Sequence, residues 1–513
     1  MDGKKYGGLL ALVIVALLGV TLWRYERWKG QTAQAGVTER ADETAWPGED
    51  AQEDRNSQAD AAGQTDEATQ TDAAEQTNGA VRTDAAGQTD GAAQADAAGQ
   101  TDETSQSAHE TQVSEVFQEA EPGKIRVLLR SDSFKSYYHS EETVVFQSAY
   151  VCTLENGEKI RCEAGEQIYF PEENTETENT VWLLEPEGEN GSFTMPLLKR
   201  SYENPLYEGS LQVTRTEEGY LFLNTLDIEA YLSAVVPSEM PARYPLEALK
   251  AQAVCARTYA YAQISSGRLK AFGADVDDSV EFQVYNNFPR DARSTQAVEG
   301  TRGLVLMENG NLADARYYST SCGIDLTRDL SEEAVFCAYL SDGQREDYEK
   351  DEPWYRWDTA FSLEELTEMA KEAGLKLGEI TALSVTEREA SGSARILRVE
   401  GTKGSTEISG EYAIRKFLKP ASTPVTRQDG STAPDLGLLP SAFFYLTEET
   451  EEETLTGYQI VGGGYGHGIG MSQNGAMHMA EAGETFEEIL KYYYGEVELD
   501  EKGSSDSQTI YGG

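Results

Sequence analysis

The sequence has too little positive charge for a nucleic-acid-binding protein. It contains 42 lysines and arginines against 90 aspartates and glutamates, which gives a formal net charge of −48. Binding to nucleic acid depends on a basic surface that neutralises phosphates, so this composition excludes that class of function. The acidity favours solubility and says nothing about the fold.

Cysteine is also scarce, and no two cysteines have the C-x-x-C spacing of zinc ribbons and redox motifs. Cys152 and Cys162 flank an Asn-Gly turn signal, so they could face each other across two antiparallel strands. Cys322 and Cys337 are a second possible pair, which leaves Cys255 buried in a helix. Five reduced thiols are the alternative, and the sequence leaves both open.

Residues 30–122 have almost no aromatic side chains. They contain a twelve-residue repeat, in which DAAGQT or DAAEQT begins at Asp60, Asp72, Asp84 and Asp96. No repeat has an apolar face for a neighbour to bury, which argues against a solenoid. This composition cannot offset the entropy of an ordered chain, so we predict a disordered linker that spans on the order of 50 Å.

The only long apolar run is Gly7–Trp23, whose 17 residues are at the lower limit for crossing a bilayer. A cleaved signal peptide is the alternative, but its A-x-A candidate, Ala33–Ala35, lies too far beyond the run. We therefore predict that residues 1–29 form a membrane anchor. Everything after residue 24 is then exported, so the expected location is the cell membrane with an extracytoplasmic domain.

Order is expected from about Lys124 onward, where strand and helix patterns mix without strict alternation. Strands are predicted at 125–129, 143–151 and 180–184, in a hairpin at 207–224, and between glycine turns at 380–410. Helices are predicted at 245–266, 363–373 and 485–494. The fold class is therefore α+β, with a β-rich subdomain or core extension at 123–205, a main domain at 206–500 and a disordered tail at 501–513.

Two segments carry polar groups in settings that suit chemistry. In Val235–Pro241 (VVPSEMP), Glu239 lies between two prolines, which predicts a stiff loop of the kind that holds catalytic groups. The alternative is that Ser238 caps a helix and Glu239 complements its dipole. Gly462–Ala476 (GGGYGHGIGMSQNGA) permits close approach of a ligand, but it lacks the lysine of a phosphate-binding loop. A glycine-rich structural turn is the alternative there.

Several motifs together resemble the SpoIID/LytB family, and its stage II sporulation protein D branch most closely. VVPSEMP is followed by EALKAQAVCARTYAY, by YYSTSCG at Tyr317–Gly323 and by GYGHGIGMSQNGA with a trailing EILKYYYG. The resemblance covers roughly residues 205–497. It implies a lytic transglycosylase that cleaves the bond from N-acetylmuramic acid to N-acetylglucosamine in peptidoglycan and leaves a 1,6-anhydro end.

In this chemistry one carboxyl group can serve both as acid and as base, because the sugar's own 6-hydroxyl attacks the anomeric carbon. The resemblance assigns that role to Glu239, whose carboxyl would need a raised pKa. The family's active-site serine falls on Ser319, or less closely on Ser321, and its tyrosine on Tyr339. Predicted substrate contacts follow from the same matching: Gln283, Tyr285, His467, Ser472 and Gln473.

Some members of the family carry a His/Cys zinc cluster just before the QVY stretch. Here residues 271–282 contain neither histidine nor cysteine, so we predict no structural zinc and no other cofactor. About one zinc per chain in elemental analysis would contradict this.

The resemblance also implies a place and partners for the protein: septal wall degradation during sporulation engulfment, beside a membrane-bound peptidoglycan amidase. Two other functions stay possible from the sequence. The LytB side of the family enhances an amidase, so the chain could be a non-catalytic enhancer. An inert wall-binding adhesin is favoured only by the long linker.

Overall fold

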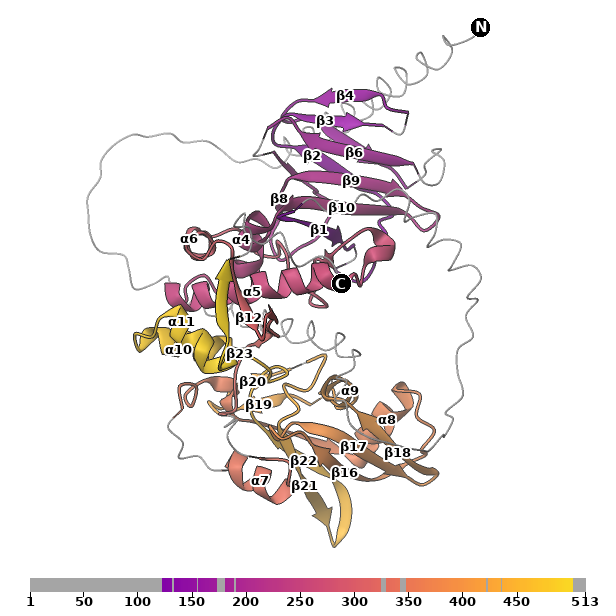
Figure 1. The fold of residues 1–513 in the computed structure, drawn as a ribbon. Helices are drawn as coiled ribbons and strands as arrows, with labels where there is room; N and C mark the ends of the chain where they lie inside the picture. Colours follow the sequence, from indigo (N-terminus) through magenta and orange to yellow (C-terminus); the bar gives the residue numbers. More distant parts are fainter. Residues whose placement is uncertain are drawn as a thin grey trace, which may run out of the picture. The chain divides into compact units, whose positions relative to one another are not determined.

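The computed structural model describes residues 122–501, apart from gaps at 132, 155, 173–179, 189–190, 324–328, 342–346, 421–422 and 435. The predicted membrane anchor, the repeat linker and the tail from residue 502 lie outside the described residues. Within these residues, no helix is both long and apolar enough to cross a bilayer. Helices and strands are mixed throughout, so the predicted α+β class is confirmed (Figure 1).

A seven-stranded sheet forms the first part of the described chain, in the order β11-β1-β10-β9-β6-β3-β4. All neighbours are antiparallel except β1 and β11. Its β9–β10 pair is the hairpin that the sequence predicted. The strands are β1 (Lys124–Leu129), β3 (Tyr150–Thr153), β4 (Lys159–Cys162), β6 (Val181–Pro186), β9 (Ser210–Arg215), β10 (Tyr220–Asp227) and β11 (Val276–Asp277).

A four-stranded sheet, in the order β5-β2-β7-β8, packs against the first. The ring of Phe170 in β5 contacts Trp182 and Phe222 of the larger sheet, with centroids 5.4 and 5.6 Å away. Its strands are β2 (Glu142–Phe146), β5 (Gln167–Phe170), β7 (Ser192–Thr194) and β8 (Leu206–Glu208).

The single strand predicted at 143–151 is wrong, because this segment is divided between the two sheets. β2 ends at Phe146 and β3 begins at Tyr150, so the chain passes from one sheet to the other between them. Both rings are fully buried in the layer between the sheets, with centroids 4.9 Å apart. Burial of these two large side chains, one from each sheet, therefore outweighs the local preference for one continuous strand.

Strands on both sides of residue 205 share these sheets. β8, β9 and β10 follow that position and pair with β7, β6 and β1, which precede it. The boundary at 205/206 stays a prediction, but the shared sheets favour an extension of the core over an added subdomain.

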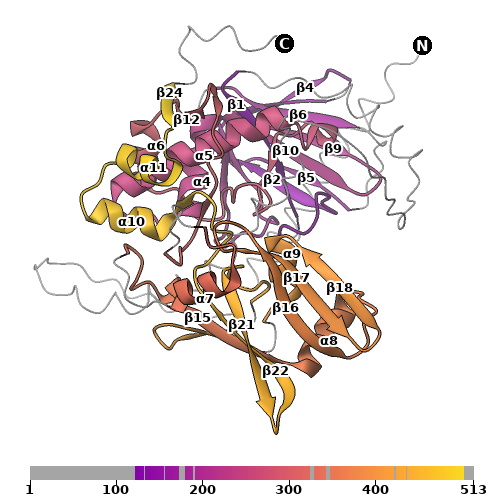
Figure 2. The same ribbon diagram turned by 60° about the horizontal axis from the view of Figure 1, so that its bottom comes forward.

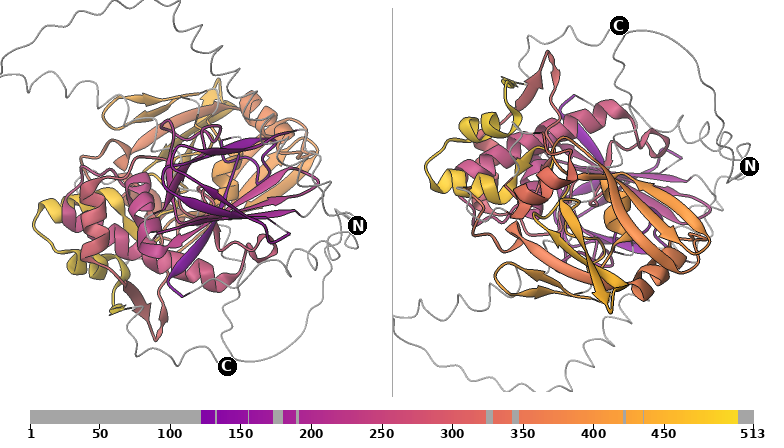
Figure 3. Two further views of the ribbon diagram at one scale, coloured as in Figure 1. Left: turned by 90° about the horizontal axis from the view of Figure 1, so that it is seen from above. Right: turned by 90° about the horizontal axis from the view of Figure 1, so that it is seen from below.

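Five helices pack into the same hydrophobic core as the two sheets. The longest, α5, begins after Pro245 and ends at Gly267, whose φ is 63°, in agreement with the prediction. The C-terminal helices α10 and α11 lie beside α5, far from it in sequence (Figures 2 and 3). The helices are α4 (Ile228–Glu239), α5 (Leu246–Ser266), α6 (Ala292–Gly300), α10 (Gln473–Glu481) and α11 (Phe486–Tyr494).

A second core lies between residues 354 and 465 and consists of a five-stranded sheet, a three-stranded sheet and two helices. Predicted helix 363–373 is confirmed as α8, which begins at a capping box formed by Ser362 and Glu365. Its elements are β15 (Trp357–Ser362), α8 (Leu363–Glu372), β16 (Ile380–Arg388), β17 (Ala394–Gly401), β18 (Gly404–Ser409), α9 (Glu411–Phe417), β19 (Val425–Arg427), β20 (Thr432–Ala433), β21 (Phe444–Glu451) and β22 (Thr454–Gly462). The short helix α7 (Glu333–Ser341) belongs to a third, smaller cluster.

The chain leaves the first core through β14 (Tyr317–Tyr318) and returns to it through β23 (Met471–Ser472). These strands pair in parallel, with Tyr317 opposite Met471 and Tyr318 opposite Ser472. Just beyond them, Thr320 forms a bridge to Tyr465. The STSCG and GYGHGIGMS motifs therefore lie side by side.

All five cysteines are free thiols. Cys152 lies opposite Ile160 and Cys162 opposite Tyr150, so the two cysteines do not face each other as the turn signal suggested. Cys322 is buried in the third cluster, whereas the Cys337 thiol donates to Glu333 on its own helix. Cys255 is buried in α5, as expected.

Candidate active site

Glu239 is the last residue of α4, not part of a loop, which corrects the expectation for VVPSEMP. Asp227 caps the N-terminus of this helix, and the helix continues through Pro237. It ends at Met240, whose extended backbone (φ −132°, ψ 133°) suits a residue that precedes Pro241. Glu239 therefore lies where the partial charge of the helix is negative, and it does not complement a helix N-terminus.

Three segments hold Glu239 in place. Its side chain is 4% exposed, and Oε1 accepts a hydrogen bond from the backbone N–H of Val284 at 2.6 Å. Its main-chain oxygen accepts one from Nε2 of Gln473 at 3.1 Å. The same Nε2 donates to Gln252 on α5 at 3.2 Å. Gln252 of α5 and Gln473, the first residue of α10, thus meet at the end of α4.

Three tyrosines lie near the Glu239 carboxyl, two of them buried and one, Tyr317, half-buried. Burial raises the pKa of Tyr231, Tyr259 and Tyr317, and the charge of nearby Glu239 raises each of them further. Arg268 opposes the rise in the pKa of Tyr259. The carboxyl group therefore lies in surroundings of low polarity in which electrostatic interactions are strong.

Gln283 lies at the centre of this tyrosine cluster. It is fully buried, its Oε1 accepts from the hydroxyl of Tyr231, and its Nε2 donates to Ala256 O and to the hydroxyl of Tyr317, each at 3.2 Å. Gln283 therefore connects α4, α5 and β14 directly behind Val284, the residue that binds Glu239.

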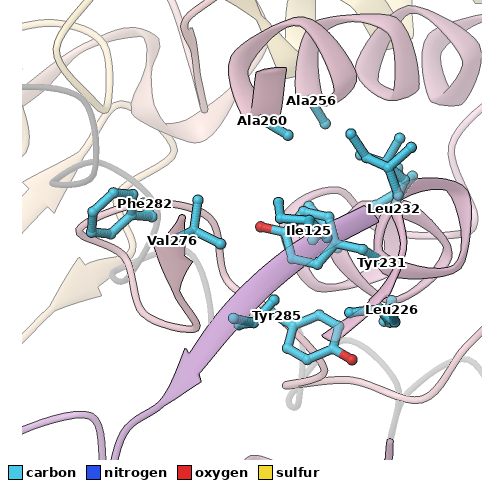
Figure 4. Packing of buried hydrophobic residues seen from close by; sticks show 14 of the residues in the cluster. Ile125, Leu226, Tyr231, Leu232, Ala256, Ala260, Val276, Phe282 and Tyr285 are labelled. Carbon is cyan, nitrogen blue, oxygen red and sulfur yellow. The ribbon is translucent and has the colours of Figure 1, made fainter. Parts of the chain in front are cut away.

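Tyr285 is also completely buried. Its ring stacks on Tyr231 with centroids 5.1 Å apart, and its hydroxyl donates to Asn224 at 2.9 Å. Figure 4 shows both rings beside Leu226 and β1. The side chains of Gln283 and Tyr285 thus fix the backbone of Val284 from both sides.

The predicted serines belong to the β14–β23 junction. Ser319 is 4% exposed, and its carbonyl oxygen accepts from Asn474 N at 3.0 Å and lies 3.2 Å from Ser472 Oγ. Its hydroxyl lies 3.1 Å from that of Thr320. Ser472 caps α10 by accepting from the N–H of Gly475. Gln473, the next residue, contacts Glu239, so the structure connects these serines to the glutamate through α10.

A buried carboxyl group at this junction, Glu349, was not found by reasoning from the sequence. Its Oε1 accepts from Ser321 N at 2.8 Å and from Ser472 Oγ at 2.6 Å. Burial raises its pKa to about 8 against the lowering effect of these hydrogen bonds. In the acid-rich stretch EDYEKDEPW, nothing in the sequence distinguishes this glutamate from the other acidic residues.

His467 uses both ring nitrogens inside the protein. Nδ1 accepts from Ile469 N at 3.1 Å, so Nε2 carries the proton and donates to Tyr317 O at 3.0 Å. Burial lowers the pKa of His467 to about 4, which keeps the ring neutral near pH 7. The ring therefore fastens the glycine-rich segment to β14.

Tyr339 packs in a different cluster from Glu239. It is on α7, it packs in the third cluster with Cys322 and Phe336, and its hydroxyl donates to Gly323 O. It thereby contacts the end of the STSCG motif. Glu239, by contrast, is flanked by residues of the first core.

The segment before QVY is fastened by ion pairs. Asp275 binds Arg126 at 2.7 Å, Asp277 binds Arg130 at 3.3 Å, and Asp278 binds Arg200. In the part of the chain that the structure describes, no group of three or more His, Cys, Asp or Glu side chains is arranged to hold a metal ion. The absence of a structural zinc stays a prediction.

Comparisons with known proteins match the same regions. A family model described as stage II sporulation protein matches residues 216–307, which include Glu239 and Gln283. A second, described as a domain of unknown function, matches residues 311–470, which include Ser319, Tyr339 and Glu349.

Three relatives carry the comparison further. An uncharacterized protein of Brachyspira hyodysenteriae is 31% identical over 294 residues, covering 57% of this chain and 72% of the relative. The amidase enhancer of Bacillus subtilis is 30% identical over 51% of this chain, which spans only 39% of that relative's length. Stage II sporulation protein D of the same species is 28% identical over 54% of this chain and 76% of the relative.

Fold and site together define an α+β protein built around a buried glutamate. The chain belongs to the SpoIID/LytB family. Sporulation is named both in the family model and in the relative that is a stage II sporulation protein.

Proposed function

We propose that this protein is a peptidoglycan lytic transglycosylase in which Glu239 is the single acid/base catalyst. The observation that carries the proposal is the buried Glu239 carboxyl, oriented by the N–H of Val284 among tyrosines of the family's matched region. A positioned carboxyl group in a site of low polarity suits proton transfer to and from a sugar oxygen.

The reaction needs no second carboxylate and no water. Glu239 donates its proton to the glycosidic oxygen as the bond from that oxygen to the anomeric carbon breaks. The 6-hydroxyl of the same muramic acid residue attacks the anomeric carbon, and its proton returns to Glu239. The products are a free 4-hydroxyl on the departing sugar and a 1,6-anhydro end, and the enzyme regains its starting protonation state.

The packing around Glu239 supports this role. The hydrogen bonds from Val284 and Gln473 fix the side chain and main chain of Glu239 independently. A group held in this way reacts with a small loss of orientational entropy.

The direct test is digestion of purified glycan strands, with and without stem peptides, by full-length wild type and Glu239→Gln. We expect anhydro-ended fragments from the wild type and a rate loss of at least about 10²-fold in the variant, measured by mass spectrometry. Glu142→Gln is the matched control, because Glu142 is also a buried carboxyl that accepts two backbone N–H groups, in the four-stranded sheet. Equal cleavage by wild type and Glu239→Gln would contradict the proposal.

A second function, non-catalytic enhancement of a peptidoglycan amidase, is favoured by the relative named amidase enhancer. The two functions differ in their dependence on Glu239. If the protein is an enhancer, the wild type and Glu239→Gln should raise the rate of a purified amidase by the same factor. Neither form should cleave glycan in the absence of the amidase.

We also propose that the protein acts outside the cytoplasmic membrane, held there by residues 7–23, on septal wall during sporulation. A membrane-bound peptidoglycan amidase is the expected partner. The apolar run and the acidic repeat linker support this arrangement.

A further inference from the structure

Glu349 connects the two motif segments that meet at the β14–β23 junction. It is 3% exposed, and in the sequence it stands between α7 and the short helix η4 (Pro353–Tyr355). One oxygen, Oε1, accepts from the N–H of Ser321 in the STSCG motif and from Oγ of Ser472 in the glycine-rich motif. A single atom therefore ties two segments that are far apart in the sequence.

The contact of Glu349 with Ser472 is made at the residue that caps α10. Ser472 is the N-cap of this helix, and its Oγ also accepts from the N–H of Gly475 and donates within the same network. Gln473 follows directly and donates to the main-chain oxygen of Glu239 and to Gln252. Two hydrogen bonds, Glu349 to Ser472 and Gln473 to Glu239, thus connect Glu349 to the backbone of Glu239 through adjacent residues.

The second oxygen of Glu349 is packed against the first turn of α10. A Cβ at Gly475 would lie 2.7 Å from Glu349 Oε2 and 2.0 Å from the hydroxyl of Tyr493. Such close approach leaves no space for α10 to shift toward Glu349. The Glu349 carboxyl therefore limits the position of α10 by steric contact, in addition to accepting hydrogen bonds.

We propose that Glu349 is a positioning residue for Glu239, acting through Ser472 and Gln473 at the N-terminus of α10. The catalytic consequence rests on the proposed function, whereas the structural one does not. Loss of the Glu349 carboxyl removes the acceptor of Ser321 N and leaves Ser472 Oγ only the longer contact with Ser319 O, so the start of α10 is held less firmly. Gln473 then holds the end of α4 less well.

The test compares Glu349→Ala, Glu349→Gln and the control Glu142→Ala in the full-length protein. Glutamine keeps a carbonyl acceptor at the position of Oε1, so it should restore what alanine removes. We expect Glu349→Ala to lower kcat on glycan about 10- to 100-fold with KM nearly unchanged, because misplacement of a catalytic group acts on the reaction step. Glu142→Ala should lower stability and leave kcat unchanged.

Hydrogen exchange gives a readout that does not depend on activity. In Glu349→Ala, exchange should rise at the N–H groups of Ser321 and Gly475, and also at Met240, whose N–H closes the last turn of α4. Faster exchange at Ser321 and Gly475 alone, with kcat unchanged, would overturn the proposal by showing a local structural role. If Glu349→Ala does not fold, Glu349→Asp, which withdraws the carboxyl by one methylene, takes its place.

The two proposals fail in different ways. If the wild type cleaves no glycan, the proposed function fails, and exchange at Met240 still decides whether Glu349 positions Glu239. If the wild type cleaves glycan and neither kcat nor Met240 responds to Glu349→Ala, only the positioning role is wrong.

Discussion

Glu349 shows how burial changes the protonation of one carboxyl group. Its pKa rises to about 8 because burial disfavours the charged form, and the charges of Asp347 and Glu352 raise it further. The titratable groups coupled to it also include Tyr318 and Tyr493. The folded protein thus holds a proton that the unfolded chain releases near pH 4.5.

This predicts a stability that falls as pH rises. Between about pH 4.5 and pH 8 the folded state binds more protons at Glu349 than the unfolded state, so the free energy of unfolding decreases. The largest slope for one group is about 1.4 kcal/mol per pH unit. Urea unfolding of the wild type and Glu349→Gln at pH 5 and pH 8 measures it. The difference between the two proteins should change with pH; a constant difference would contradict the prediction.

The sequence identified Glu239 but not the manner in which it is held. The motif around it predicted a stiff loop, whereas the residue ends a helix that continues through Pro237. Gln283 and Tyr285 were assigned to substrate, and the structure places them in the buried network behind Val284. Their substrate role stays a prediction.

Among the helices, the first turn of α10 is packed closely against its neighbours. Gly475→Ala would place a Cβ 2.0 Å from the hydroxyl of Tyr493, so we expect a loss of about 1–3 kcal/mol in the free energy of unfolding. Gly300, the last residue of α6, is the matched control, because its Cβ would meet only Lys250 Cε at 3.6 Å. Gly300→Ala should be neutral or stabilising. Equal stabilities of the two variants in thermal unfolding would contradict the prediction.

The segment that precedes QVY is held by charge. Arg200 and Asp278 are both fully buried, so Arg200→Met should leave an unpaired buried carboxylate and lower stability by about 3–5 kcal/mol. Arg161, whose side chain is 51% exposed beside Glu187, is the control, and Arg161→Met should change stability by less than about 1 kcal/mol. Chemical denaturation measures both. A small effect for Arg200→Met would show that the ion pair does not hold the segment.

Helices with strong local signals were predicted well. α5 follows a proline and ends at a glycine, and α11 begins at a capping box formed by Thr485 and Glu488. These signals act within one turn of the helix. The division of 143–151 between two sheets was missed, because it depends on which sheets bury Phe146 and Tyr150.

For the molecule as a whole, we expect the predicted anchor to hold the protein at the membrane. Deleting residues 1–29 should move the protein from the membrane pellet to the soluble fraction, as measured by fractionation and immunoblotting. Solubility of the full-length protein would contradict the anchor. An N-terminus found beyond Ala35 in the exported protein would support the cleaved signal peptide instead.

The family, the α+β class and the glutamate on which the proposed chemistry depends could be inferred from the sequence, because motifs, helix caps and periodicity involve residues that are close along the chain. The surroundings of that glutamate became known only from the folded structure: the N–H of Val284, the amide of Gln473 and the buried carboxyl of Glu349. The physical reason is that burial and hydrogen bonding act between segments that folding brings together. The residues that contact a side chain across the core do not produce a recognisable pattern in the sequence next to it.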